Sequence, residues 1–550
     1  MKADQIIKNA KIFTSDKNNP MASAMVVKDG KFVYVGDEAG LANYEGEVTD
    51  LSGKFIMPGI IDCHIHVPLS IAFEYANMGL RFECDGKQAA LDFMADYIKK
   101  NPGLDRYRFL MNKTCLNGEI LTKEDLDAIC PDSELVVLED EVHSVWVNSK
   151  LLAAKGISDD TPDMVPGLSY YVRKDGHVTG NAFESAAWAF LFELEKLTDE
   201  QLEAPILKFI DYCEKTGVSG GFEASFPGNP EYLERVYKYL RKMDEEGRLP
   251  VYLDGSYMLV DPTKLDEALE GLKRFNREFN TEHLKVHTLK LLMDGTQKIH
   301  TAGMVTPYVD TGETGPTTFD AKGLLNVLKR LNEEGFDLHA HTVGERASRT
   351  VLDAVEMAKK ELGDKFRVRV TCAHLEIQDD ADLDRFGKLG VFANFTPYWH
   401  MGDPSNSAPW LGKERAAKMF RCKTLWDSGA VVTWSCDNVS FDFMTWSPYL
   451  GMEIGMTRRA TEKTRVPEYG RTAEVFPPVN ERMGVEEMLL GYTINAAKQI
   501  GAEGRKGSIE VGKDADFLVF DKDLLTAEHE GFSYNMPAEV YFSGNLVNKG

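Results

Sequence analysis

Short apolar runs alternate with amphipathic stretches through most of this 550-residue chain. In the amphipathic stretches, apolar residues recur three or four positions apart, as in Leu324, Leu325, Leu328 and Leu331, which predicts helices with one buried face. The short runs predict eight strands, at residues 60–66, 217–223, 250–257, 286–292, 335–341, 367–374, 390–396 and 430–437. Eight strands that each precede a helix indicate an α/β fold, the (β/α)8 or TIM barrel.

The two ends of the chain follow a different pattern, in which strand-like runs are joined by turns. Near the N-terminus, Asp29-Gly30 separates two such runs, which is a strong hairpin signal. The same pattern of strand-like runs is present again at residues 515–520 and 539–542. We therefore expect the two ends to pair into one small β domain.

The first two predicted barrel strands lie about 150 residues apart, far more than a connection through one helix needs. We therefore expect residues 68–200 to form an inserted region with a structure of its own. Loops that follow barrel strands lie over the catalytic face, so this insertion would cap the substrate pocket.

Composition narrows the class of protein and of partner. Hydrophobic residues make up 43% and charged residues 27% of the chain, which is ordinary for a globular protein. The 63 basic and 87 acidic residues give a net charge of −24, which disfavours nucleic acid and anionic membranes as partners. No signal-type apolar segment or membrane-length apolar run is present, and the eight cysteines form no C-x-x-C pair. We expect a cytoplasmic protein with reduced thiols.

Candidate metal ligands stand at the ends of the predicted barrel strands. His64 and His66 close the first strand, and residues two apart on a strand point to the same face. An H-x-H triplet alone fits a metal site and an ordinary histidine pair equally well. The other strands add Lys290, His341, His374 and Asp437. Because barrel strand ends ring one cavity, this convergence predicts a metal site.

Each of the added residues also has an ordinary structural interpretation. His341 has a neighbour, His339, and one of the two could be a packing or supporting histidine; we favour His341 as the ligand because it lies nearer the mouth. His374 could be a core histidine, and Asp437 could cap a following helix. A lysine such as Lys290 at a strand end is more often solvated or ion-paired.

Several longer motifs carry a family resemblance. They are Met57–His66, His143–Ser149, Thr179-Gly180 with Glu184, Lys290–Thr296, His341–Ala347, Ala373–Glu376, Ser435–Asp437 and Gly507–Asp516. In these motifs the chain resembles the amidohydrolase superfamily, in particular the YtcJ-like branch that includes N-substituted formamide deformylase. The resemblance runs nearly from end to end.

The resemblance implies a composite β-sandwich from residues 1–56 and 505–550 beside a metal-bearing barrel at 57–504. It also implies that Lys290 is carboxylated by CO2 and bridges two zinc ions, with manganese or iron as alternatives. His64, His66, Lys290 and Asp437 would hold one ion. Lys290, His341 and His374 would hold the other. Carboxylation requires a neutral amine, hence a lysine pKa lowered by burial or by nearby cations.

The chain departs from the family pattern at three places. Glu345 stands where relatives carry aspartate, and we interpret it as a supporting or helix-N-terminal residue. Ser435-Cys436 replaces Gly-Ser before Asp437, which puts the shape of the pocket in question. If His339 points inward beside His341, it would modify the second metal position.

These features predict a metal-dependent hydrolase of a carbon–nitrogen bond in a small, linear, partly apolar or aromatic amide. The metal would activate water as hydroxide, and Asp437 would serve as general acid and base. His143 is a candidate contact of the substrate carbonyl, while Glu184 and Trp399 are candidates for the remainder. For all three, a supporting or packing role is the alternative.

Other functions remain open at this stage. A deaminase or cyclic-amide hydrolase would use the same fold, and a mononuclear deaminase would not need Lys290. A non-catalytic binding protein on this fold would be marked by lost metal ligands, and none is lost. The expected partner is a small amide, and a homo-oligomer is compatible with the sequence.

Overall fold

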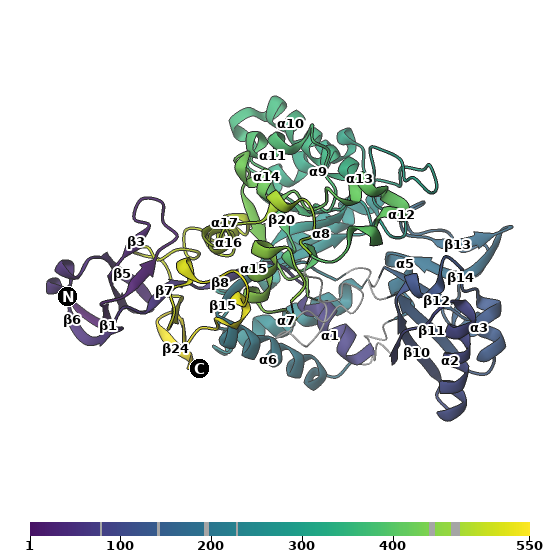
Figure 1. The fold of residues 1–550 in the computed structure, drawn as a ribbon, viewed down its shortest axis with the longest axis horizontal. Helices are drawn as coiled ribbons and strands as arrows, with labels where there is room; N and C mark the ends of the chain where they lie inside the picture. The colour runs from purple at the N-terminus through teal and green to yellow at the C-terminus, as the bar shows by residue number, and fades with distance from the viewer. Residues whose placement is uncertain are drawn as a thin grey trace.

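A computed structural model shows a central barrel with a β-sandwich on one side and an inserted sheet on the other (Figure 1). It describes residues 1–76, 80–139, 143–191, 197–226, 229–438, 446–461, 463 and 474–549. The predicted insertion at 68–200 therefore includes residues 77–79, 140–142 and 192–196, which lie outside the described residues. The predicted fold class, a TIM barrel with a terminal β-sandwich and a large insertion after the first strand, is confirmed.

Eight parallel strands form the barrel and follow one another around it in chain order. They are β8 (Ile60–Ile65), β15 (Val218–Glu223), β16 (Tyr252–Leu259), β17 (Leu284–Leu292), β18 (Asp337–Thr342), β19 (Val370–His374), β20 (Phe392–Phe395) and β21 (Val432–Trp434). Each lies where the sequence predicts a strand, with ends displaced by a few residues.

The first and last strands meet at a seam. The amide of Asp437 donates to the carbonyl of His64 at 2.9 Å, and the amide of Cys436 donates to the Asp62 carboxylate at 3.1 Å. Asp62 is fully buried, and this burial raises its pKa to about 7. These two hydrogen bonds, one of them to a side chain, join the barrel at the seam between β8 and β21.

Helices cover the outside of the barrel, and α9 (Ala321–Glu334) shows why its sequence folds in this way. Asp320 accepts from the amide of Gly323 at 2.7 Å and caps the first turn. The predicted leucine stripe is buried along one face, and Gly335 ends the helix at φ +75°. Other barrel helices include α6 (Asp199–Thr216), α7 (Pro230–Glu245), α8 (Leu265–Phe279), α10 (Glu345–Leu362), α11 (Leu383–Leu389), α14 (Cys422–Asp427), α16 (Val485–Gly491) and α17 (Ile494–Gln499).

The inserted region builds a separate six-stranded sheet between β8 and β15. Its strands, in spatial order, are β13 (Tyr171–Lys174), β14 (His177–Phe183), β12 (Ser144–Val147), β11 (Glu134–Glu139), β10 (Arg106–Met111) and β9 (Leu80–Phe82). Helices α2 (Lys87–Lys100) and α3 (Lys123–Ile129) lie against it (Figure 1), with an apolar core of their own that includes Met94 and Phe109.

Both ends of the chain contribute to the β-sandwich. One sheet holds β5 (Lys31–Gly36), β4 (Ala24–Lys28), β1 (Lys2–Lys8) and β6 (Glu45–Asp50). The other places β3 (Met21–Ala22), β2 (Lys11–Phe13) and β7 (Phe55–Pro58) beside the C-terminal strands β22 (Phe517–Phe520), β23 (Glu539–Phe542) and β24 (Asn545–Lys549), and the two sets meet where β7 pairs with β22. The predicted pairing of the two chain ends is therefore confirmed. Phe520 on β22 is aligned with Phe55 on β7.

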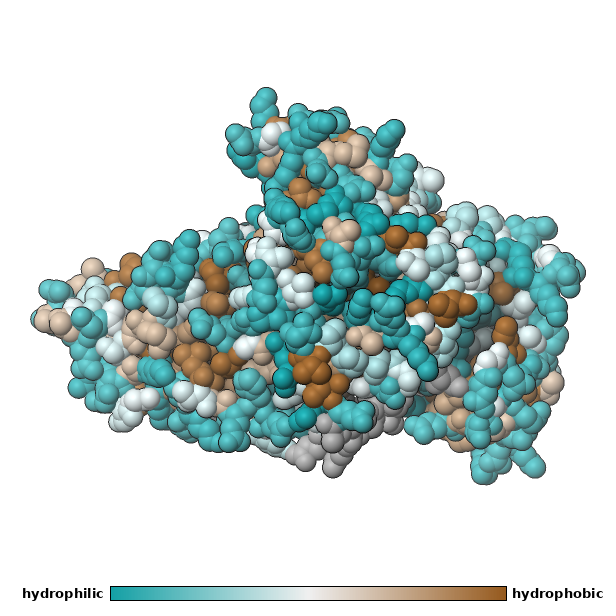
Figure 2. Space-filling model, turned by 45° about the horizontal axis from the view of Figure 1, so that its top comes forward, coloured by the Kyte–Doolittle hydropathy of each residue, from teal (hydrophilic) through white to brown (hydrophobic). Residues whose placement is uncertain are grey.

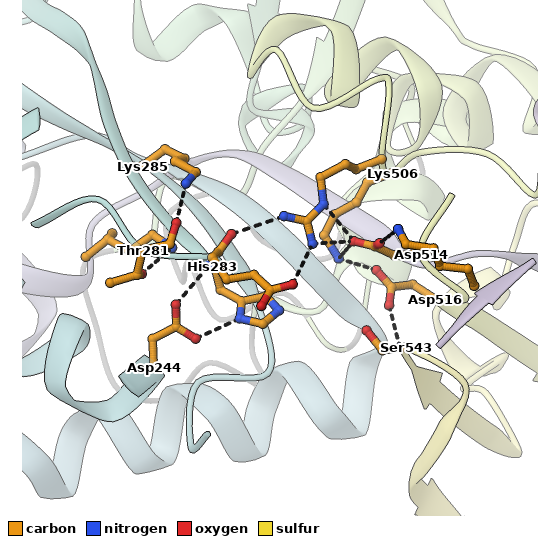
Figure 3. A network of polar contacts seen from close by, with 12 residues as sticks. Asp244, Thr281, His283, Lys285, Lys506, Asp514, Asp516 and Ser543 are labelled. Atoms are coloured by element: carbon orange, nitrogen blue, oxygen red, sulfur yellow. Dashed lines mark hydrogen bonds and ion pairs between the residues drawn. The ribbon is translucent and has the colours of Figure 1, made fainter. Parts of the chain in front are cut away.

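A polar network joins the sandwich to the bottom of the barrel (Figure 3). Lys506 has a nearly fully buried side chain and pairs with Asp516 and, at 3.7 Å, with Asp514. Arg505 also pairs with Asp514, at 2.8 Å, and donates to the backbone carbonyl of Glu282 at 3.2 Å. These contacts fix the C-terminal segment against the strand-entry loop of β17.

Replacing Lys506 by methionine is expected to lower the free energy of unfolding by about 3 kcal/mol, because it leaves a buried carboxylate without its cation. Lys31→Met is the matched control. It removes another partner of Asp514, at 2.9 Å, but the Lys31 side chain is half exposed, so we expect a loss below about 1 kcal/mol. Urea unfolding of both variants measures the difference, and equal losses would contradict this account.

The face shown in Figure 2 is largely hydrophilic, and its apolar side chains form small separate groups. Among the described residues, the chain contains no helix with the length and apolar character needed to span a membrane.

Candidate metal centre

Three predicted ligands from the two seam strands converge at the C-terminal end of the barrel. His64 ends β8, His66 follows it, and Asp437 follows β21. The Nε2 atoms of His64 and His66 lie 3.6 Å and 3.4 Å from Asp437 Oδ1. One potential ligand atom from each residue fits within a 4.8 Å cluster. This is the spacing of side chains that share one cation.

The remaining three predicted ligands surround this cluster. Lys290 Nζ on β17 lies 3.0 Å from His64 Nε2, and His374 Nδ1 at the end of β19 lies 3.5 Å from Asp437 Oδ2. The ring of His341 on β18 lies 4.3 Å from that of His374, measured between centroids. The structure therefore brings all six residues to one place.

Two observations support metal binding by these residues. His374 Nδ1 is buried and lacks a hydrogen-bond partner among the described residues, although it faces Asp437. His374 and Asp437 also have positive φ angles, +77° and +50°, which residues other than glycine seldom adopt. Strain of this kind is typical of functional sites.

The protonation states implied by burial suit metal binding. Burial, followed by the charges of neighbouring groups such as Lys290, holds the pKa values of His64, His341 and His374 well below the usual range. Neutral imidazole is the form that binds metal ions. His66 directs Nδ1 toward the carbonyl of Ser225 at 3.1 Å, which leaves Nε2 facing Asp437.

Lys290 meets the condition for carboxylation. Its side chain is 2% exposed. Burial lowers its pKa to about 7, and the negative charges of Asp437 and Glu223 oppose this by raising it. A large share of the amine is then neutral near pH 7, the form that reacts with CO2. A carbamate at this position would add two oxygen donors and a negative charge between the histidines.

His339 lies deeper in the barrel than the other histidines. Its Nε2 lies 3.0 Å from His64 Nδ1, and its ring stacks on Phe222 at 4.2 Å. It therefore supports His64 from behind. The sequence analysis favours His341 over His339 as the ligand and leaves open whether His339 points inward. His339 does point inward, as the period of two along a strand implies, but it contacts His64.

The insertion brings a second group of side chains beside the metal cluster. His143 Nδ1 lies 2.6 Å from Glu184 Oε2, and the His143 ring lies 6.1 Å from that of His341. Glu184 is buried, and its other oxygen accepts from the Thr301 hydroxyl at 2.8 Å. Trp399 stacks on another candidate ligand, His374, with a centroid distance of 5.4 Å.

The departures from the family pattern lie in supporting positions. Glu345 is the first residue of α10 and accepts from the amide of Thr306 at 3.2 Å. Ser435 bonds to the carbonyl of Phe395 on β20 at 3.1 Å, while Cys436 bonds to Asp62 at the seam. Asp62 is a structural contributor that the sequence analysis missed, because no local pattern shows which carboxylate meets the last strand.

Comparisons with known proteins agree with this geometry. The family model described as "Amidohydrolase family" matches residues 47–548. N-substituted formamide deformylase of Arthrobacter pascens is 26% identical over 547 residues, covering 94% of each chain. The putative amidohydrolase YtcJ of Bacillus subtilis is 26% identical over 541 residues, covering 93% of each. An uncharacterized metal-dependent hydrolase from Pyrococcus horikoshii shares the fold, with a TM-score of 0.67, 21% identity and coverage of 96% of this chain and 99% of that one.

Proposed function

The chain belongs to the amidohydrolase family, and from this membership we propose that it hydrolyses the carbon–nitrogen bond of a small linear amide. The observation that carries the proposal is the meeting of six ligand-type side chains, Asp437 among them, from five strand ends. The formamide deformylase named above, similar over nearly its whole length, supports a linear amide as the substrate class.

We propose that His64, His66, Lys290 and Asp437 hold one metal ion, and that Lys290, His341 and His374 hold a second. Zinc is the proposed metal because imidazole and carboxylate or carbamate ligands suit it. When bound, the metal activates water and polarises the scissile carbonyl as a Lewis acid. The remaining chemistry falls to the chain's own side chains.

Asp437 is proposed as the proton carrier. Its two oxygens face His64 and His66 on one side and His374 on the other, so it stands at the centre of the site. It takes a proton from the attacking water as oxygen bonds to the carbonyl carbon. It then returns that proton to nitrogen as the carbon–nitrogen bond breaks, which yields an acid and an amine.

The mouth of the site favours an apolar or aromatic group on the substrate. Trp399 and Trp188 lie near the cluster, against His374 and His143 respectively. We propose that the half-buried Trp399 packs against the substrate's apolar part and that His143 contacts its carbonyl oxygen. The inserted region would then cap the pocket from above.

Trp399→Ala is expected to raise KM about tenfold and leave kcat within about twofold. The lost aromatic packing is worth about 1.5 kcal/mol, and it is equal in the ground and transition states. Steady-state kinetics on the best amide substrate measure this change. Trp426→Ala removes a partly buried tryptophan on α14, one of the helices that cover the outside of the barrel, and serves as the control. Unchanged constants in Trp399→Ala would remove the proposed contact.

The function is tested by metal analysis together with a hydrolysis screen. Protein purified without chelator is expected to hold two metal ions per chain and to release amines from N-substituted formamides or N-acyl amino acids. Turnover of lactams or hydantoins instead would indicate a cyclic-amide hydrolase. Ammonia release from aminated heterocycles with one ion per chain would indicate a deaminase. Absence of bound metal would favour a non-catalytic protein.

A further inference from the structure

Two cysteines that are 31 positions apart in the sequence meet in the inserted region. Cys84 follows β9 and Cys115 follows β10, and these strands are parallel neighbours in which Phe82 is aligned with Met111. The amide of Gly86 donates to the carbonyl of Cys115 at 2.7 Å and joins the two turns after the strands. The sequence shows no C-x-x-C pair because this pair forms only through the sheet.

A third sulfur atom lies beside the two thiols. Cys84 Sγ is 3.8 Å from Met111 Sδ and 3.8 Å from the carbonyl oxygen of Cys115. The Cys115 thiol is close enough to hydrogen-bond with the Cys84 thiol. Three sulfur atoms from the ends of two neighbouring strands therefore meet at one place, and we call Cys84, Met111 and Cys115 the sulfur cluster.

The sulfur cluster is anchored on one side and accessible on the other. Met111 is fully buried in the apolar core of the insertion, which also includes Phe109. Cys115 lies in a short turn whose geometry is fixed by its amide, which donates to the carbonyl of Asn112 at 3.1 Å. Both cysteines are partly exposed, so a small solute can reach their thiols.

The other six cysteines are placed differently. All of them are buried: Cys63, Cys130, Cys213, Cys372, Cys422 and Cys436. Cys130, in the same insertion, contacts the carbonyl of Ser133 at 3.4 Å. Buried thiols of this kind are packing residues. Cys84 and Cys115 are the two cysteines that are both adjacent to each other and accessible.

The proximity of the two thiols favours a bound cation over a reactive thiolate. Burial, followed by the neighbouring Cys115, raises the pKa of Cys84 to about 11. The thiols are therefore protonated near neutral pH, the form that is slow to be oxidised. A cation that binds both sulfurs as thiolates offsets their mutual repulsion and releases their protons.

The type of ligand selects the type of cation. Thiolate and thioether sulfurs are soft ligands that suit Cu(I), whereas carboxylate and carbonyl oxygens suit magnesium, calcium or manganese. Metal–sulfur bonds are about 2.3 Å long, so sulfurs that share an ion in a trigonal site lie about 4 Å apart. The 3.8 Å between Cys84 Sγ and Met111 Sδ agrees with this spacing.

The same geometry disfavours zinc at the sulfur cluster. Structural zinc sites use four thiolate, imidazole or carboxylate ligands. Among the residues that the structure describes, no histidine, carboxylate or further cysteine forms a group with Cys84 and Cys115 in which all ligand atoms lie within 4.8 Å. The third ligand is a thioether, which is a ligand of Cu(I).

We propose that Cys84, Met111 and Cys115 form a binding site for one Cu(I) ion in the inserted region. Two thiol protons leave as two copper–thiolate bonds form, and the Met111 thioether donates a third electron pair. Copper stays in the Cu(I) state, so the step needs no oxidant. The three ligands differ from those proposed for the barrel, and the site does not depend on the proposed amide hydrolysis.

Anaerobic titration of the zinc-loaded protein with Cu(I), in competition with a coloured Cu(I) chelator, tests the proposal. The wild type is expected to take up one Cu(I) per chain. Cys84→Ser and Cys115→Ser are each expected to weaken the affinity at least about a hundredfold, because even the partners of metal ligands contribute ten- to a hundredfold. Met111→Leu keeps the size of the side chain and is expected to weaken it about tenfold.

Cys130→Ser is the matched control. It removes a buried thiol from the same insertion but leaves the sulfur cluster intact, so we expect the Cu(I) affinity to stay within about twofold. A loss equal to that of Cys84→Ser would show a general effect of cysteine replacement and overturn the proposal. Unchanged affinity in both Cys84→Ser and Cys115→Ser would also overturn it.

X-ray absorption at the copper edge identifies the ligands in the wild-type protein, without any variant that must fold. Sulfur neighbours at about 2.3 Å are expected. Nitrogen neighbours would place copper on histidines and overturn the proposal. A Cys84–Cys115 disulfide in protein that takes up no Cu(I) even after reduction would overturn it as well. None of these readouts depends on turnover of an amide, so the proposed function is tested separately.

Discussion

Asp437→Asn is expected to lower kcat for amide hydrolysis by about a thousandfold, equivalent to about 4 kcal/mol of transition-state stabilisation. Asparagine keeps the size of the side chain and an oxygen that can face the histidines. It cannot accept a proton from water or return one to the leaving nitrogen. The two oxygens of Asp437 face three of the histidines, so its carboxylate stands among the groups proposed to hold the metal.

Metal content separates the two roles of Asp437. His64, His66, Lys290, His341 and His374 remain in the variant, so we expect it to retain most of its metal while losing turnover. Single-turnover kinetics and elemental analysis on the same sample provide the comparison. Activity that falls only in proportion to metal content would mean that Asp437 is a ligand and carries no proton.

Lys290→Ala is expected to lose one of two metal ions per chain and to reduce kcat at least a thousandfold. The variant removes the amine from which a carbamate forms and opens a space beside His64, from which Lys290 Nζ lies 3.0 Å away. A small carboxylate such as acetate fits the chemistry of the missing carbamate. Added acetate is therefore expected to restore part of the second metal and part of the activity.

The effect of pH on metal loading follows from the same lysine. Burial lowers the pKa of Lys290 to about 7, so the neutral amine is scarce below that value and predominates above it. Loading of metal-free protein with zinc and bicarbonate is expected to yield more carbamate as the pH rises from 6 to 8. Full activity and two metals in Lys290→Ala without acetate would contradict a bridging role.

The sequence predicts the barrel well because its signal is repetitive. Eight apolar runs with helices between them define the order of strands, and their ends must converge when the barrel closes. That geometry places His64, Lys290, His341, His374 and Asp437 together before any distance is known. The strand bounds shift by only a few residues, as in β16, which runs from 252 to 259 where 250 to 257 is predicted.

Other parts of the site depend on contacts that no local pattern encodes. Glu184 lies behind His143 because of how the inserted sheet docks on the loop that contains Gly295 and Thr301, more than a hundred residues away in sequence. The support of His64 by His339 spans 275 residues. The division into domains at residues 56 and 505 stays a prediction.

The seam between the first and last barrel strands sets the order in which the chain can fold during synthesis. Asp62 and Cys436, which bond across it, are 374 residues apart, and β7 likewise pairs with the late strand β22. The ribosome therefore delivers the apolar strand β8 long before its final neighbour exists. Contacts of such sequence separation form slowly, and exposed strand edges favour aggregation meanwhile. The intervening insertion, whose six strands pair among themselves, can fold early and reduce the length of chain that must wait.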